Sequence, residues 1–233
     1  MNFAEYNVKD ANLEEVLLAL KSLDTVEAVA LGGSRSTGAS DENSDYDIYV
    51  YCAEIPTAET RENLLEKYCS IAEFGNHYWE SEDNTVMNNG IPVDIIYREV
   101  DRFGRYIDTV IKGGKAFNGY TTAFWHNIKN SKVLFDKSGS FTKFRDMAQI
   151  DFPENLRSAI IKNNRNLLNG KLPSYDRQIK KAQERGDIVS VNHRITAFLE
   201  SYFDVIFALN RQTHPGGDHK RHEERHSQRP EPR

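Results

Sequence analysis

Three aspartates lie in short apolar segments, from which they could together hold a divalent metal ion. Asp45 and Asp47 open the segment SDYDIYV at 44–50, and Asp94 lies between β-branched residues in a second apolar run. Side chains two apart in a strand point to the same face, and Asp94 can join the other two from a neighbouring strand. Such oxygen ligands suit Mg²⁺, which shares them with substrate phosphates. Two ions about 3.5–4 Å apart would clamp the attacking and leaving oxygens of a phosphoryl transfer.

A turn of small residues precedes these aspartates and is suited to binding phosphate. The segment LGGSRSTG at 31–38 follows an apolar run. Gly33 lets the backbone approach a phosphate closely, while Ser34 and the next amides can donate hydrogen bonds to its oxygens. Arg35 adds a positive charge in the same turn. The turn and the aspartates together predict a nucleotide site.

The elements that must position these groups mix strands and helices before residue 150. Apolar and β-branched runs predict strands at 26–31, 46–52, 77–79, 85–87, 91–97 and 132–135. Helical spacing predicts helices at 12–23, 55–69 and 98–111, the first capped by Asn12. The turn signal Asn88-Asn-Gly90 predicts a hairpin between the strands on either side of it.

Beyond residue 150 the pattern becomes helical. Apolar residues recur at helical spacing through 153–168, 175–185 and 187–209, whereas the sequence after Thr213 has almost nothing to bury. We therefore predict an α/β domain over residues 1–150, a helical domain over 151–212 and a disordered tail over 213–233.

Composition and charge narrow the class of protein. The chain has 233 residues, a hydrophobic content of 39%, a mean hydropathy of -0.65 and a net charge of -5. An acidic chain without a recognisable nucleic-acid module argues against DNA or RNA as a partner. The sequence has no apolar run of membrane-spanning length and no visible signal peptide, so we expect a soluble cytoplasmic protein with no membrane partner.

Taken as a set, these motifs resemble the nucleotidyltransferase superfamily that includes DNA polymerase beta. Gly33-Ser34, a spacer of ten residues, Asp45-Tyr-Asp47 and then Val93-Asp94-Ile95 carry the resemblance. Within the superfamily, the chain looks most like bacterial antibiotic nucleotidyltransferases of the aminoglycoside and lincosamide types and their uncharacterised relatives. The resemblance implies a mixed, twisted sheet with flanking helices, followed by a C-terminal helical domain.

The same resemblance implies a reaction. A hydroxyl of a small-molecule acceptor attacks the α-phosphorus of a nucleoside triphosphate, usually ATP, and pyrophosphate leaves. Asp45 and Asp47 would hold two Mg²⁺ ions, and Asp94 would complete the attacking-side site and accept the hydroxyl proton. Some relatives use a separate carboxylate as the base, for which the candidates are Glu82, Glu99 and Asp136.

Two residues beyond residue 150 are further candidates for nucleotide binding, and other acceptors, functions and assemblies stay open. Lys162 and Arg194 lie on predicted helices that should face the active-site cleft, so they are candidate contacts to the triphosphate. The acceptor could instead be a protein, as in antitoxins that adenylylate a toxin. The fold could also bind a nucleotide without turnover. Some relatives are dimers with shared sites, so a homodimer stays open.

Overall fold

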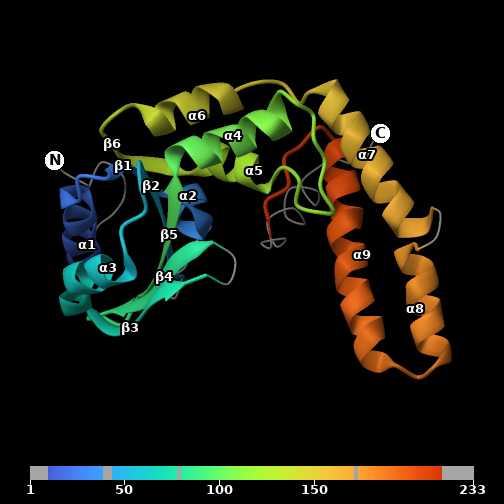
Figure 1. The fold of residues 1–233 in the computed structure, drawn as a ribbon, viewed down its shortest axis with the longest axis horizontal. Helices are drawn as coiled ribbons and strands as arrows, with labels where there is room; N and C mark the ends of the chain where they lie inside the picture. Colours follow the sequence, from blue (N-terminus) through green and yellow to red (C-terminus); the bar gives the residue numbers. More distant parts are fainter. Residues whose placement is uncertain (1–9, 39–43, 78–79, 171–172, 217–233) are drawn as a thin grey trace, which may run out of the picture. The chain divides into compact units, whose positions relative to one another are not determined.

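The computed structural model describes residues 10–38, 44–77, 80–170 and 173–216. The chain divides into two compact units, one of residues 1–106 with 127–149 and one of residues 107–126 with 150–233 (Figure 1). The predicted disordered tail lies outside the described residues from 217 onward. No helix in the described ranges has the length and apolar character needed to cross a bilayer.

A six-stranded mixed sheet forms the centre of the first unit, with the strand order β3-β4-β5-β2-β1-β6. The strands are β1 (Val26–Leu31), β2 (Tyr46–Cys52), β3 (Cys69–Asn76), β4 (Ser81–Met87), β5 (Pro92–Glu99) and β6 (Lys132–Asp136). β2 and β5 run parallel, and the other neighbours are antiparallel. The predicted hairpin between β4 and β5 is present. The predicted α/β fold with a mixed sheet is confirmed.

Seven helical segments accompany these strands before residue 150 in the described ranges. They are α1 (Ala11–Ser22), α2 (Gly33–Thr37), α3 (Ala58–Leu65), the 3₁₀ turn η2 (Glu66–Tyr68), α4 (Val100–Ile111), α5 (Ala123–Asn130) and α6 (Ser140–Ala148). Asp10 caps α1 by accepting hydrogen bonds from the amides of Asn12 and Leu13, so the predicted cap at Asn12 is corrected by two residues. A carboxylate is a good cap because it satisfies amides that the first turn leaves unpaired.

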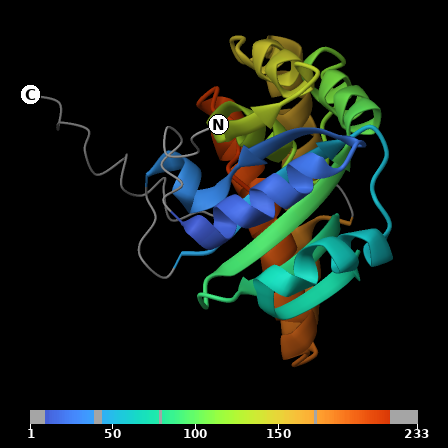
Figure 2. The ribbon, with the colours of Figure 1, turned by 90° about the vertical axis from the view of Figure 1, so that its left-hand side faces the viewer.

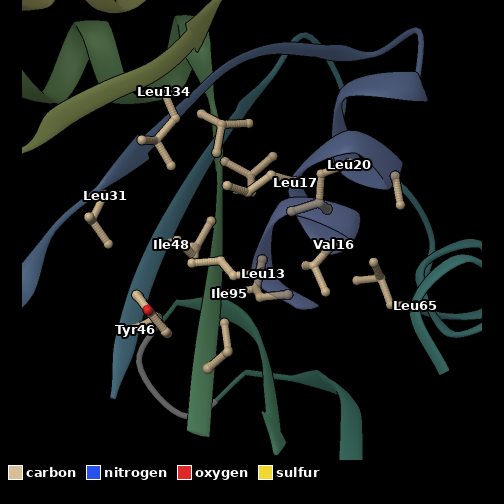
Figure 3. Close-up of a cluster of buried hydrophobic side chains, with 14 of the residues drawn as sticks. Leu13, Val16, Leu17, Leu20, Leu31, Tyr46, Ile48, Leu65, Ile95 and Leu134 are labelled. Atoms are coloured by element: carbon tan, nitrogen blue, oxygen red, sulfur yellow. The ribbon is translucent and has the colours of Figure 1, made fainter. Parts of the chain in front are cut away.

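The main core lies between α1 and one face of the sheet (Figure 3), and Figure 2 shows α1 lying across the strands. Leu13, Val16, Leu17 and Leu20 form one helical stripe, and they point toward Ile48 and Ile95 of the two central strands. The same core takes Tyr46 and Val50 from β2 and Val93 and Tyr97 from β5. Alternate residues of these strands must therefore face the other side of the sheet.

The segment 69–76 forms a strand that the sequence did not predict. It forms the edge strand β3, whereas the sequence predicted that a helix would run on to residue 69. Only one side of this strand is paired and its burial does not alternate cleanly, so the sequence lacks the usual period of two. The short strand predicted at 77–79 falls mostly on residues 78 and 79, outside the described ranges.

Three long helices dominate the second unit. They are α7 (Glu154–Asn169), α8 (Tyr175–Glu184) and α9 (Ile188–Leu209), and α9 packs along both of the others (Figure 1). Asp187 caps α9 by accepting a hydrogen bond from the Ser190 amide. The start of the predicted tail belongs to this packing, because His214 is buried and its amide donates to Thr122 Oγ1 at 2.7 Å.

A buried carboxylate ties the segment 117–121 to α9 within this unit. Asp204 accepts hydrogen bonds from the amide and the hydroxyl of Thr121, at 3.1 and 2.7 Å, and from Asn164 Nδ2 at 3.1 Å. Asn164 in turn accepts a hydrogen bond from the Gly119 amide. All three groups that contact Asp204 are hydrogen-bond donors, so both of its carboxylate oxygens act as acceptors.

Replacing Asp204 by asparagine should remove a pH dependence from the stability of this unit. Burial raises the pKa of Asp204 to about 6, although the hydrogen bonds from Thr121 and Asn164 act to lower it. Between its ordinary pKa and 6 the folded state holds more protons than the unfolded state, so stability falls as pH rises. From about pH 4.5 to about pH 7, the unfolding free energy of wild type minus that of Asp204→Asn should fall by roughly 2 kcal/mol.

Urea denaturation at the two pH values measures this difference. Asp176 in the same unit is a matched control, because the hydrogen bond from Ser174 lowers its pKa. The corresponding difference for Asp176→Asn should therefore show no decline over that pH range. A difference for Asp204→Asn that did not change with pH would contradict the assignment of a buried carboxylate with a raised pKa.

Candidate active site

The second face of the sheet carries the aspartates that the sequence singled out. Because Ile48 and Ile95 face the core, Asp47 and Asp94 face the opposite side. The two are directly paired across the parallel strands β2 and β5. Asp45 comes two residues before Asp47, just ahead of the strand, and is exposed. The strand register thus brings together two carboxylates that are 47 positions apart in the sequence.

The small-residue turn lies directly against Asp47. Gly33 is the first residue of α2 and has a φ of 57°, in the left-handed region that favours glycine. A Cβ on Gly33 would lie 1.6 Å from Asp47 Oδ2, and one on Gly32 would lie 2.2 Å from the ring of Tyr49. The Gly32 amide also donates to the Asp47 carbonyl at 2.8 Å. The two glycines therefore allow the turn to touch the carboxylate strand.

Arg35 donates hydrogen bonds to the backbone just before β2. Its Nε lies 2.9 Å from the Ser44 carbonyl oxygen and 3.0 Å from that of Asp45, and Nη2 also donates to Ser44. Its guanidinium lies over the ring of Tyr46 at 4.0 Å from the centroid. These contacts fix the backbone that carries Asp45, which is a role the sequence did not suggest. The predicted contact of Arg35 with phosphate stays a prediction, as does that of Ser34, the second residue of α2.

A row of polar side chains continues from Asp94 toward the edge of the sheet. Asn84 of β4 is paired with Asp94, and its Nδ2 donates to Asp94 Oδ1 at 2.9 Å. Asn76 of β3 donates from Nδ2 to Asn84 Oδ1 at 2.7 Å. Sequence reasoning missed both asparagines. The one available signal was the alternation of Glu82, Asn84 and Val86 with buried residues, which places all three on one face.

Glu82 is the one of the three alternative base candidates that shares this face. It lies one alternation from Asn84, and burial together with the carboxylates of Asp94, Glu80 and Asp83 raises its pKa. Glu99 follows the opposite alternation of β5, with Val93 and Tyr97. Asp136 accepts hydrogen bonds from the Phe141 and Thr142 amides at the start of α6. Glu99 therefore faces away from Asp94, and Asp136 is engaged at the start of α6.

An aromatic and basic group lies farther along the same face. Arg98 is buried, forms a bidentate ion pair with Glu80 at 2.6 and 2.7 Å, and donates to the Tyr51 hydroxyl. Its guanidinium also lies 4.3 Å from the ring centroid of Tyr49. Burial raises the pKa of Tyr49 to about 12, with Arg98 opposing. Beyond Arg98, Tyr51 packs on phenylalanines of α4 and α6, so the exposed polar end gives way to an apolar one.

The donor set at Asp47 and Asp94 fits a magnesium ion that arrives with a nucleotide. Within the described ranges, no three His, Cys, Asp or Glu side chains are grouped so as to hold a metal ion alone. Mg²⁺ commonly takes one or two carboxylates and completes its octahedral shell with phosphate oxygens and water. The pair supplies two carboxylates, and Asp47 adjoins the turn predicted to bind phosphate.

Lys162 and Arg194 lie in the second unit, on α7 and α9 respectively. Lys162 is exposed and Arg194 is half-buried. Their contact with the triphosphate stays a prediction. The site residues of the first unit form a set by themselves.

Two family models match the chain. Residues 13–116 match the nucleotidyltransferase domain, and residues 122–219 match a domain of unknown function (DUF4037). The first match contains Gly33, Asp45, Asp47 and Asp94, together with both asparagines of the polar row. Comparison with curated proteins gave no match.

Several solved structures are similar to this chain, each at low identity. A nucleotidyltransferase-like protein from Exiguobacterium sibiricum is 9% identical, covering 90% of this chain and 58% of its own, with a TM-score of 0.40. A toxin-antitoxin with AMP-PNP is 17% identical over 58% of this chain and 82% of its own (TM-score 0.34). A CD-NTase from Bradyrhizobium diazoefficiens in complex with GTP is 11% identical over 90% and 88% (TM-score 0.31).

These scores are too low to bear on function, so the identification rests on the family match and on the site within it. The matched region contains five of the six strands of the sheet, β1 to β5, and the paired aspartates. The chain therefore contains a nucleotidyltransferase domain in residues 13–116.

Proposed function

We propose that this enzyme moves a nucleoside monophosphate, AMP from ATP, to a hydroxyl of a small-molecule acceptor and releases pyrophosphate. The observation that carries the proposal is the contact between the turn and the carboxylates. Gly33 adjoins Asp47 Oδ2, and Asp47 is paired with Asp94 across parallel strands. A triphosphate on the turn would therefore lie beside both carboxylates, where charge must be neutralised during transfer.

Each residue has a defined part in this reaction. The amides after Gly33 and the Ser34 hydroxyl donate to phosphate oxygens, while Asp45, Asp47 and Asp94 would hold Mg²⁺. Bound there, Mg²⁺ supplies charge neutralisation for the phosphates and orients them. The acceptor oxygen bonds to the α-phosphorus, the bond from that phosphorus to the bridging oxygen breaks, and the hydroxyl proton passes to Asp94. Lys162 and Arg194 remain proposed contacts to the leaving pyrophosphate group.

The charge around the polar row favours a cationic acceptor. Glu82 and Asp94 share this face, and the pKa of Glu82 is raised partly by the negative charge of its neighbours. A positively charged amine on the acceptor would relieve this repulsion. Among small molecules with hydroxyls, aminoglycosides carry several amines, and an antibiotic of this kind is therefore the first acceptor to test.

A pyrophosphate-release assay tests the proposal. The protein would be incubated with Mg²⁺ and each of the four nucleoside triphosphates, with a panel of aminoglycosides and lincosamides. Release that depends on one acceptor, and that is absent from an Asp47→Asn/Asp94→Asn variant of matched stability, is the expected result. ATP should give the fastest release.

Two other outcomes would redirect the assignment. Triphosphate binding without release in the presence of every compound would contradict a small-molecule antibiotic acceptor. Transfer of label from α-labelled ATP to a protein would then identify a protein-modifying enzyme, the alternative that the sequence leaves open. Failure of the wild-type protein to bind any triphosphate with Mg²⁺ would contradict the proposed function altogether.

A further inference from the structure

The strand β3 contains an irregularity that changes which residue faces the polar row. Glu73 is paired with Asn84, whereas Asn76 is paired with Glu82. Three steps along β3 therefore match two steps along β4, which is the extra residue of a β-bulge. Gly75 lies inside it with a φ of 79°, a left-handed conformation that glycine adopts without steric cost.

The bulge has a direct effect on side-chain direction. In an unbroken strand, residues an odd number of positions apart point to opposite faces, so Glu73 and Asn76 would be on opposite sides of the sheet. The extra residue restores Asn76 to the face of Asn84. Asn76 Nδ2 can then donate to Asn84 Oδ1 at 2.7 Å.

This contact determines how the Asn84 amide is oriented. With its oxygen engaged by Asn76, Asn84 presents its NH₂ group to Asp94 Oδ1 at 2.9 Å. The opposite orientation would set two donors against each other and point an oxygen at a carboxylate. The side chains therefore form a directed chain of hydrogen bonds, from Asn76 through Asn84 to Asp94.

We propose that Asn84, oriented by Asn76 and the Gly75 bulge, is a positioning residue that sets the plane of the Asp94 carboxylate for metal binding. The final torsion of an aspartate is soft, with broad minima. A hydrogen bond to one oxygen fixes that torsion and so directs the other oxygen. Removal of such supporting hydrogen bonds commonly weakens metal binding about 10–100-fold. This inference rests on the proposed function, because it needs Asp94 to bind a metal ion.

Mn²⁺ binding, followed by electron paramagnetic resonance, tests the proposal without turnover. The full-length protein would be titrated with Mn²⁺ in the presence of an α,β-methylene analogue of ATP, in which the bond to be broken is blocked. Asn84→Ala should weaken Mn²⁺ binding about tenfold or more, and Asn76→Ala should weaken it less, in the same direction.

Asn88→Ala is the matched control, since Asn88 lies in the β4–β5 turn and donates to the Lys67 carbonyl instead. Its Mn²⁺ affinity should equal that of wild type. A well-folded Asn84→Ala variant with wild-type Mn²⁺ affinity would overturn the proposal. If Asn84→Ala does not fold, Asn76→Ala on the edge strand decides, and unchanged affinity there would overturn the proposal equally.

The same titration separates this inference from the proposed function. If wild type binds Mn²⁺ with the analogue and Asp94→Ala does not, the metal site of the proposed function is supported, whatever the affinity of Asn84→Ala. Wild type that binds no Mn²⁺ with any triphosphate analogue would remove the proposed function, and this inference with it.

Discussion

Gly33→Ala should abolish nucleotidyl transfer almost as completely as removal of the Asp47 carboxylate. The new Cβ would lie 1.6 Å from Asp47 Oδ2 and 2.7 Å from its Cγ, so either the turn or the aspartate must move by more than an ångström. Misplacement of reacting groups by about 1 Å can reduce a rate about 100-fold. The φ of 57° adds strain, because a side chain there crowds the backbone.

Gly90 is a control that has the backbone strain of a positive φ without the steric clash of Gly33. Gly90 has a φ of 85°, in the β4–β5 turn, and a Cβ there would meet nothing within 4 Å. Gly90→Ala should therefore lose about 1–2 kcal/mol of stability and keep its activity. Pyrophosphate release and urea denaturation of both variants measure the two effects. A Gly33→Ala variant with more than half of wild-type activity would contradict the close approach of the turn to Asp47.

The paired aspartates could be predicted because their signal is local. Asp47 lies in a run of aromatic and β-branched residues, and Asp94 interrupts a second run of β-branched residues, so each carboxylate is placed in a strand by its own neighbours. Which strand pairs with which, and in what register, could not be predicted. The parallel pairing that sets Asp47 opposite Asp94 depends on the whole sheet, and nothing in either segment specifies that register.

The supporting residues could not be predicted, and the reason is again register. Asn76 and Asn84 look like ordinary polar residues near a turn, and they meet only because a bulge in β3 shifts the pairing by one residue. Arg35 likewise makes contacts that the sequence did not reveal. Its guanidinium lies on the carbonyls that precede β2, a contact that its place in the turn did not suggest, while its contact with phosphate stays a prediction.

Arg61→Leu should destabilise the first unit by about 3–5 kcal/mol, because it leaves a buried carboxylate without its cation. Arg61 of α3 and Asp83 of β4 form an ion pair at 3.2 Å, with side chains 2% and 0% exposed. The guanidinium also lies 4.4 Å from the ring centroid of Tyr97. Asp83 lies on the core side of β4, whereas its neighbour Asn84 lies on the opposite face of the same strand.

The destabilisation should depend on pH in a defined direction. Burial already raises the pKa of Asp83, while the Gly75 amide and Arg61 oppose that rise. Loss of Arg61 removes one opposing influence, so the pKa should rise further in the variant. The folded variant then holds a proton that the unfolded chain has released, and its stability falls as pH rises. The deficit relative to wild type should therefore be largest near neutral pH and smaller in acid.

Two further variants make the assignment specific. Asp83→Asn in the Arg61→Leu background removes the unpaired charge and keeps an oxygen that can accept the Gly75 amide, now at 2.8 Å. It should recover a large part of the lost unfolding free energy. Arg102→Leu, an exposed arginine of the same unit, should change it by less than about 0.5 kcal/mol. Urea denaturation at neutral and acid pH measures all four proteins, and an Arg61→Leu effect no larger than that of Arg102→Leu would contradict the buried pair.

The buried pair also connects stability to the site. Asp83 Oδ1 accepts the Gly75 amide at 2.8 Å, and Gly75 is the residue that forms the bulge. The bulge turns Asn76 toward Asn84, and Asn84 donates to Asp94. Since the carboxylate behind β4 holds the backbone that orients the amides in front of it, Arg61→Leu should weaken Mn²⁺ binding even at pH values where the variant is folded. A folded Arg61→Leu variant with wild-type Mn²⁺ affinity would show that the bulge keeps its shape without the ion pair.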